Sequence, residues 1–226
     1  MIKKLYISII LIFFSLNFFS QESIRYHFLT PISKNEIFIR IFKYEKQLEV
    51  WTKNEYDSEF KLYKKYNVCF MSGGFGPKRC EGDLQVPEGF YYINDFNFHS
   101  NYKLSLGINY PNESDKILSK CKNPGGLIYI HGDCVSVGCI SMKENIDEIF
   151  NLALKAKMNG QEQIPVHIFP INYHNFNSLR FFEEKITQNQ NLVDFEKNIF
   201  DGFIYFEDSS YLPKVTVNEY GKYIFN

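Results

Sequence analysis

A histidine and a cysteine stand eight positions apart in the segment 129–142, between two short apolar runs. A thiol is a poor nucleophile until it loses its proton, and an imidazole within hydrogen-bond reach can take that proton and stabilise the thiolate. We therefore expect Cys139 to act as a nucleophile and His131 as its general base. Gly132 and Gly138 permit tight backbone turns beside the two reactive side chains.

The residues on either side of this pair predict the elements that hold it. Residues 127–130 are apolar and follow a Pro-Gly-Gly turn, which predicts a short buried strand that delivers His131 to a turn. After the cysteine, apolar residues recur at helical spacing over 143–159, which predicts an amphipathic helix packed behind the cysteine loop.

Two alternatives compete with the thiol–imidazole pair. In the first alternative, Cys139 is a buried structural cysteine that packs beside a core histidine. In the second, His131, Asp133, Cys134 and Cys139 hold zinc, an arrangement that exported proteins seldom use. A strand ending in His-Gly, followed by a Gly-Cys turn, favours the catalytic interpretation.

Five cysteines are present, at positions 69, 80, 121, 134 and 139. If the chain is exported and its cysteines pair, an odd number leaves one free thiol. If Cys139 is that thiol, the other four cysteines allow three pairings, and reduced buried cysteines are an alternative to all of them. A disulfide between Cys134 and Cys139, acting as an oxidative off-switch, is a further hypothesis.

The N-terminus carries Lys3 and Lys4 and then an apolar run from Leu5 to Phe19, which is typical of a signal peptide over residues 1–20. An uncleaved N-terminal anchor is the alternative. Export predicts an oxidising location, the periplasm or cell envelope. The net charge of -1 argues against nucleic acid as a partner.

The rest of the chain predicts an α+β protein that is mostly β. With 226 residues and 45% hydrophobic content, the chain is long enough for one domain and an appendage. Apolar patterning predicts strands at 36–53 (two, joined by a turn), 60–66, 67–71, 90–93, 103–110 and 164–169. We place the catalytic domain at residues 36–171.

Residues 172–226 mix amide, charged and aromatic residues, which predicts two helices separated near residues 188–190 in an extension packed on the catalytic domain. Three further histidines have no partner at catalytic spacing. We expect His99 to be exposed, His167 to lie in solvent or in a satisfied core position, and His174 to be superficial and unpaired.

At the histidine and cysteine the sequence resembles the L,D-transpeptidase catalytic domain of the YkuD type, whose signature is His-Gly followed by Ser-x-Gly-Cys. Segments 76–83, 87–93 and 104–111 look like the branch of that family that acts on murein crosslinks or murein-attached proteins. The similarity covers roughly residues 36–171. Two departures are Val137, where the family usually has a second histidine, and a shortened His-to-Ser segment, which removes a substrate-covering loop.

The resemblance implies a mostly-β sandwich and acyl transfer on peptidoglycan stem peptides. Cys139 would attack the carbonyl of the third stem residue, His131 would be oriented by the Gly132 carbonyl, and N–H groups at Gly138 and Cys139 would bind the oxyanion. No metal or organic cofactor is implied.

Other site residues follow less directly. Lys78 and Arg79 are expected to hold a substrate carboxylate, with solvated loop charges as the alternative. Ser136 is expected beside the substrate and Asp133 beside the catalytic pair, and ordinary turn capping is the alternative for both.

The fate of the acyl group stays open at this point. Transfer to an amine makes a crosslinking enzyme of cell wall remodelling. Transfer to water makes an amidase or hydrolase that cleaves crosslinks or a murein-linked protein. A murein-binding module without catalysis is the third interpretation.

Overall fold

The computed structural model describes residues 35–226, so the predicted signal peptide at 1–20 lies outside the described residues. Strands and helices are both abundant, and the predicted α+β class is confirmed. Within the described residues, no helix is both long and apolar enough to cross a membrane.

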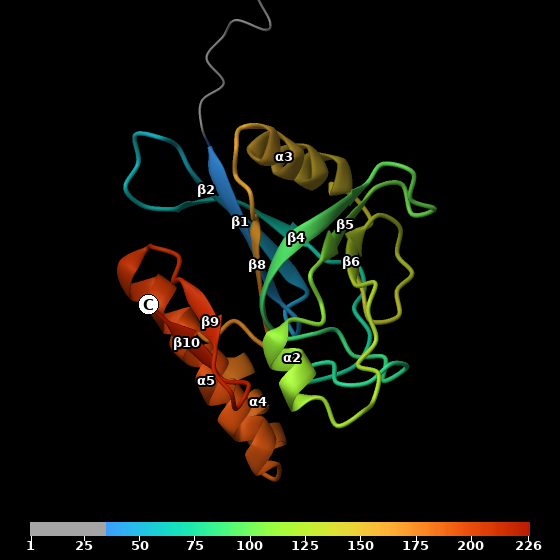
Figure 1. Ribbon diagram of the computed structural model, residues 1–226, viewed down its shortest axis with the longest axis vertical. Coiled ribbons are helices and arrows are strands. Elements are labelled where there is room, and N and C mark those ends of the chain that lie inside the picture. Colours follow the sequence, from blue (N-terminus) through green and yellow to red (C-terminus); the bar gives the residue numbers. More distant parts are fainter. Residues whose placement is uncertain (1–34) are drawn as a thin grey trace, which may run out of the picture. The chain divides into compact units, whose positions relative to one another are not determined.

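One eight-stranded sheet organises the described chain (Figure 1). Its spatial order is β3-β2-β1-β8-β4-β5-β6-β7, with antiparallel pairs throughout except for β1–β8 and β6–β7, which are parallel. The strands are β1 (Glu36–Phe42), β2 (Gln47–Lys53), β3 (Lys61–Asn67), β4 (Gly89–Asn97), β5 (Ser105–Ile108), β6 (Tyr129–His131), β7 (Ile140–Ser141) and β8 (Pro165–Phe169).

Strand β4 joins the two halves of the sheet. Its first residues, from Gly89 to Tyr92, pair with β8, and its later residues pair with β5, with a register irregularity between Ile93 and Asp95. Such irregularities bend a strand. Buried residues from both halves and from the helix after β7 form one core cluster, so both halves close on the same apolar interior.

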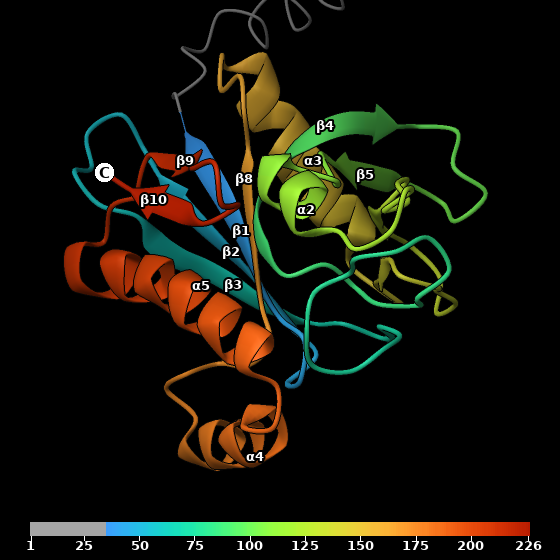
Figure 2. The same cartoon turned by 60° about the horizontal axis from the view of Figure 1, so that its bottom comes forward.

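Helix α3 (Ile146–Met158) follows β7, the strand that begins directly after Cys139, and packs on β1 and β5 (Figures 1 and 2). Its buried residues recur at intervals of three and four, as an amphipathic helix requires. The helix predicted over 143–159 is confirmed. A second, short helix, α2 (Glu113–Leu118), begins at a capping box made by Asn112 and Asp115.

The C-terminal residues form α4 (Phe176–Ile186), α5 (Gln190–Ser209) and a two-stranded ribbon of β9 (Val215–Val217) and β10 (Tyr223–Phe225). The predicted break between two helices is confirmed, and α5 lies along the sheet in Figure 2. Aromatic residues from α5 pack against Phe42, Phe90 and Phe169 of the sheet. Contacts between phenylalanine rings thus attach the C-terminal extension to the sheet.

Two local predictions differ from the structure, and a third, for His167, is decided between its two alternatives. Residues 67–71 form no strand beyond β3, and only an isolated bridge joins Phe70 to Ser141. His167 is buried among aromatic rings, where burial lowers its pKa to about 3 and keeps it neutral, so the core alternative is the right one. His174 is exposed but not unpaired, because its ring contacts the Glu207 carboxylate at 2.5 Å.

Two buried carboxyl groups, those of Glu88 and Glu196, lie where α5 meets the loop before β4. Lys43 donates to Glu88 and to the carbonyls of Gly76 and Val86, which holds that loop to the end of β1. Glu196 of α5 is also buried, and burial together with the neighbouring Glu88 raises its pKa well above the ordinary value. Burial and the neighbouring carboxyl group therefore favour the protonated form of Glu196 in the folded protein.

Glu196→Gln should make the folded protein more stable at neutral pH. A raised carboxyl pKa means that the folded state binds more protons than the unfolded state, so stability falls as pH rises above about 4.5. Glutamine does not titrate, so the fall in melting temperature between about pH 5 and pH 8 should become shallower. Glu183→Gln, at an exposed site on α4, is the matched control. Identical pH slopes for all three proteins would contradict the assignment.

Candidate active site

The pairing of β6 with β7 brings the predicted nucleophile and base to one face of the sheet. The strands are parallel, with Ile130 opposite Ile140. One residue earlier, Cys139 lies beside Tyr129, whose backbone N–H donates to Cys139 Sγ at 3.4 Å. Because side chains alternate between faces along a strand, Cys139 projects on the same face as His131, while the two isoleucines enter the core.

The His131 ring is held in one tautomer. Its Nδ1 lies 2.5 Å from the carbonyl oxygen of Gly132. A carbonyl oxygen only accepts, so Nδ1 carries the proton and Nε2 of the neutral ring keeps its lone pair. The expected hydrogen bond from His131 to the Gly132 carbonyl oxygen is confirmed. Tyr102 covers the ring with a centroid separation of 4.8 Å, and His131 is only 3% exposed.

The Cys139 thiol is half-buried against the backbone that leads into β6. Its sulfur donates to the Leu127 carbonyl oxygen at 3.5 Å and accepts from the Tyr129 N–H. Burial raises the pKa of Cys139, although the Tyr129 N–H and the positive charge of Lys78 oppose the rise. The thiol is protonated at neutral pH, so catalysis through it needs a base.

Two glycines allow the close packing of this loop. A Cβ at Gly132 would lie 2.6 Å from the Tyr102 carbonyl oxygen, which no side chain tolerates. Gly138 has φ +81°, in the left-handed region, and a Cβ there would meet the Gln85 carbonyl oxygen at 3.3 Å. The predicted need for glycine at both positions is confirmed.

Two serines fix the cysteine turn. Ser136 Oγ donates to the Cys139 carbonyl oxygen at 2.7 Å, so its hydroxyl closes the turn, and its predicted contact with substrate stays a prediction. Ser72 Oγ accepts from the Gly138 N–H and donates to the Leu84 carbonyl oxygen, both at 2.7 Å. The Gly138 N–H, expected to bind the oxyanion, is therefore already engaged.

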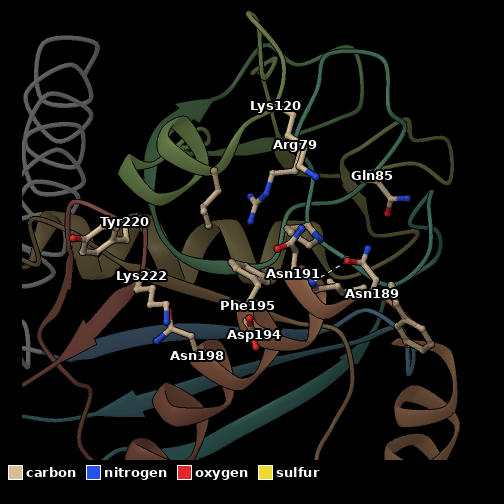
Figure 3. A pocket seen from close by; sticks show the side chains of 16 residues that line it. Arg79, Gln85, Lys120, Asn189, Asn191, Asp194, Phe195, Asn198, Tyr220 and Lys222 are labelled. Atoms are coloured by element: carbon tan, nitrogen blue, oxygen red, sulfur yellow. Dashed lines mark hydrogen bonds between the residues drawn. The ribbon is translucent and has the colours of Figure 1, made fainter. Parts of the chain in front are cut away.

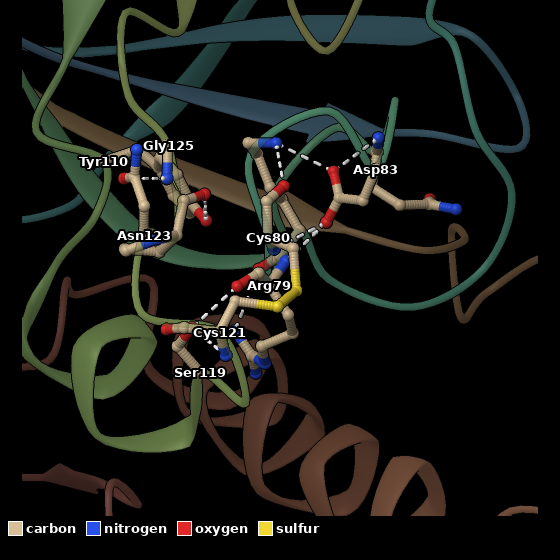
Figure 4. Close-up of a disulfide and its surroundings, with 11 residues drawn as sticks. Arg79, Cys80, Asp83, Tyr110, Ser119, Cys121, Asn123 and Gly125 are labelled. Atoms are coloured by element: carbon tan, nitrogen blue, oxygen red, sulfur yellow. Dashed lines mark hydrogen bonds and ion pairs between the residues drawn. A yellow bond between two sulfur atoms is a disulfide. The ribbon is translucent and has the colours of Figure 1, made fainter.

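Four of the five cysteines form disulfides, Cys69–Cys134 and Cys80–Cys121, and Cys139 is free. The first bond ties the turn between the histidine and the cysteine to the segment before the glycine-rich loop. Figure 4 shows the second bond. The hypothesis of a Cys134–Cys139 disulfide is wrong because Cys134 is bonded to Cys69. The zinc alternative loses Cys134 as a ligand for the same reason.

Lys78 and Arg79 both make internal ion pairs. Lys78 is 5% exposed and its Nζ bonds Asp83 and the Cys80 carbonyl oxygen, each at 2.7 Å. Arg79 Nη1 lies 2.8 Å from Asp115, whose pKa burial raises to about 6 against the opposing charge of Arg79. Neither side chain is a solvated loop charge. Their predicted role in binding a substrate carboxylate stays a prediction.

Comparison with known proteins agrees with this geometry. Residues 36–168 match the model of the YkuD family, the L,D-transpeptidase catalytic domain. The chain belongs to the L,D-transpeptidase family. YafK of Escherichia coli K12, a candidate L,D-transpeptidase, is 34% identical over 206 residues, which cover 86% of this chain and 79% of YafK. A matching protein of Escherichia coli O157:H7 gives the same values.

Solved structures with weaker similarity include the helical cell shape determining protein Pgp2 of Campylobacter jejuni, at 20% identity and a TM-score of 0.48, covering 83% of this chain and 76% of that one. A mutant of Pgp2 aligns at 21% identity with a TM-score of 0.48, covering 71% of this chain and 60% of the mutant chain. Bd1075 of Bdellovibrio bacteriovorus aligns at 21% identity with a TM-score of 0.41, covering 70% of this chain and 61% of that one.

The sequence singled out His131 and Cys139 but gave no sign of the residues that contact their segment. Ser72 borders a glycine cluster, and such clusters mark close backbone approaches, but nothing in the sequence pairs it with Gly138. Tyr102 lies in a polar loop and carries no signal of its contact with His131.

Iodoacetamide should label one thiol per unreduced chain, at Cys139, and the rate should depend steeply on pH. A thiol with a raised pKa gains thiolate about tenfold for each pH unit near and above neutrality, so the rate constant should still be rising at about pH 9. Intact mass spectrometry gives the stoichiometry and time course, with fully reduced, unfolded protein as the control. A second label before reduction, or a plateau below about pH 7.5, would contradict the assigned disulfides or the thiol environment.

Proposed function

We propose that this protein is an exported cysteine enzyme that acts on peptidoglycan stem peptides through a thioester on Cys139. The observation that carries the proposal is the β6–β7 register, which puts Cys139 and the Nδ1-protonated His131 on one face. Membership of the L,D-transpeptidase family supports peptidoglycan as the substrate. Two disulfides beside one free thiol suit an oxidising compartment outside the cytoplasm.

In the proposed first step, His131 Nε2 takes the proton from Cys139 as the sulfur attacks a stem-peptide carbonyl carbon. The carbonyl π electrons move to oxygen, and the oxyanion accepts a hydrogen bond from the backbone N–H of Cys139. Collapse of this intermediate breaks the carbon–nitrogen bond. The departing amine takes the proton from His131, which leaves a thioester on the sulfur.

In the second step an acceptor attacks the thioester carbonyl, and His131 removes the acceptor's proton. The sulfur leaves as thiolate and takes the proton back from His131. An amine acceptor gives a new amide bond, and water gives a free carboxylate. Neither reaction, as proposed, uses a metal or organic cofactor, and neither changes an oxidation state.

Hydrolysis is a second candidate because the loop around the thiol is open to solvent. Val135 and Val137 are 59% and 71% exposed, and Leu127, whose carbonyl contacts the sulfur, is 81% exposed. Water is present at about 55 M, so an efficient transferase excludes it or holds its amine at a high effective concentration. An open site favours cleavage of crosslinks or of a murein-linked protein. A murein-binding module without chemistry is the remaining alternative.

Purified protein should convert disaccharide-tetrapeptide or crosslinked muropeptides, and mass spectrometry of the products separates the candidates. Crosslinked dimers or exchange of the terminal D-amino acid establish transfer, whereas shortened stems or released crosslinks establish cleavage. Cys139→Ser should lower turnover by roughly a thousandfold or more, because a serine hydroxyl is far less acidic than a thiol.

The melting temperature of Cys139→Ser should stay near that of the wild type, which controls for folding. Full activity in this variant contradicts the thioester. Unchanged substrates with retained murein binding leave only the binding module.

A further inference from the structure

A cavity of about 530 Å³ lies between the loop before β4, the end of α2, the start of α5 and the turn before β10 (Figure 3). Neither His131 nor Cys139 lines it. Its volume is within the range of sites that hold small ligands. Its walls come from the catalytic domain and from the C-terminal extension, so attachment of the extension creates it.

The walls combine apolar and polar side chains and carry an excess of positive charge. They present the amides of Gln85 and three asparagines, the rings of Phe75, Phe195 and Tyr220, and four charged side chains, Arg79, Lys120, Lys222 and Asp194. Lys120 and Lys222 are exposed, and neither makes an ion pair within residues 35–226. Three cations against one carboxylate favour an anionic ligand.

Arg79 is the fixed cation of this cavity. Asp115 holds Nη1 at 2.8 Å, and the guanidinium carbon lies 4.7 Å from the centroid of the Phe195 ring. Among residues 35–226 its side-chain hydrogen bonds use only Nη1, to Asp115 and to the Lys78 carbonyl oxygen. The Nε–Nη2 edge of the guanidinium has no hydrogen-bond partner among these residues. That edge matches a carboxylate in a two-pronged geometry, and Figure 3 shows the guanidinium directed toward α5.

The same loop faces both the cavity and the thiol. Gln85 lines the cavity, and its carbonyl oxygen would lie 3.3 Å from a Cβ at Gly138, next to the nucleophile. Lys78, which precedes Arg79, is close enough for its charge to act on the Cys139 thiol. A polymer bound at the thiol can therefore reach the cavity by crossing this loop.

We propose that the cavity is an accessory site for a carboxylate-bearing stem peptide of the murein polymer, held while Cys139 acts on a neighbouring stem. The identity of the polymer rests on the proposed function. The carboxylate is bound by the free edge of Arg79, with Lys120 and Lys222 adding positive charge at the wall. The site would hold the polymer at the enzyme and takes no part in bond making.

Titration of the full chain carrying Cys139→Ala with a soluble stem tetrapeptide tests the proposal. Backbone amide signals of residues 189–198 and 220–222 should shift, which reports on the cavity and not on the thiol. Lys120→Glu combined with Lys222→Glu should raise the dissociation constant read from these signals roughly tenfold. Arg79→Lys keeps the ion pair to Asp115 but loses the two-pronged edge, and should weaken binding about fivefold.

The matched control is Lys155→Glu combined with Lys214→Glu, which makes the same charge change at two exposed lysines outside the cavity and should bind like the wild type. A tetrapeptide with its carboxylates converted to amides should bind weakly to every variant. Wild-type binding by both cavity variants overturns the proposal, as does equal binding of the amidated peptide. Glycan chains without stems that shift the same signals with the same variant dependence overturn it as well.

These results separate the inference from the proposed function. If the wild type converts no muropeptide but the titrations behave as expected, the proposed catalysis fails and the carboxylate site stands. If the wild type converts muropeptides while the cavity variants bind as it does, the accessory site fails and the catalysis stands.

Discussion

The parallel pairing of β6 with β7 is the interaction on which the rest of the site depends. Each strand is only two or three residues long, so the pairing gains little from its own hydrogen bonds. Contacts with the rest of the fold stabilise the pairing. Ile130 and Ile140 enter the main core, and the Phe70 bridge to Ser141 covers the far edge of β7. A slip of one residue would turn Cys139 to the opposite face from His131.

Covalent bonds support this short pairing. The Cys69–Cys134 disulfide spans 65 positions of sequence, and a loop of that length corresponds to about 4 kcal/mol of stabilisation in the chain-entropy model. It restrains the turn between the histidine and the cysteine, which has few buried apolar side chains of its own. The Cys80–Cys121 bond restrains the loop that carries Arg79. Both loops are thus restrained, and among residues 35–226 only Cys139 keeps a free thiol.

The electrostatics of the site follow from burial. A half-buried thiol next to backbone dipoles is easier to keep neutral than to ionise, so the raised pKa of Cys139 is the expected result of its position. Because Nδ1 of His131 is held protonated by the Gly132 carbonyl, the lone pair of the ring lies on Nε2. In the proposed mechanism the thiolate therefore forms when substrate is present and is not stored in the resting protein.

The sequence predicted local features well and long-range contacts poorly. His131, Cys139 and the two glycines were identified because reactive types and turn residues lie within one short segment. Helix α3 was identified from its periodicity. The disulfide partners, the ion pair between Arg79 and Asp115 and the role of Ser72 join segments tens of residues apart, and no local pattern records such contacts. Strand β7 was missed because two residues carry no periodicity.

The central claim is that Cys139 forms the covalent bond and His131 supplies the base. Its most direct test is capture of the acyl-enzyme from wild-type protein mixed with disaccharide-tetrapeptide and quenched in acid, followed by peptide mapping. We expect a hydroxylamine-labile acyl group on the peptide that contains Cys139, formed roughly a hundredfold more slowly in His131→Ala. An acyl group on another residue, turnover without an adduct at Cys139, or unchanged adduct formation in His131→Ala would contradict it.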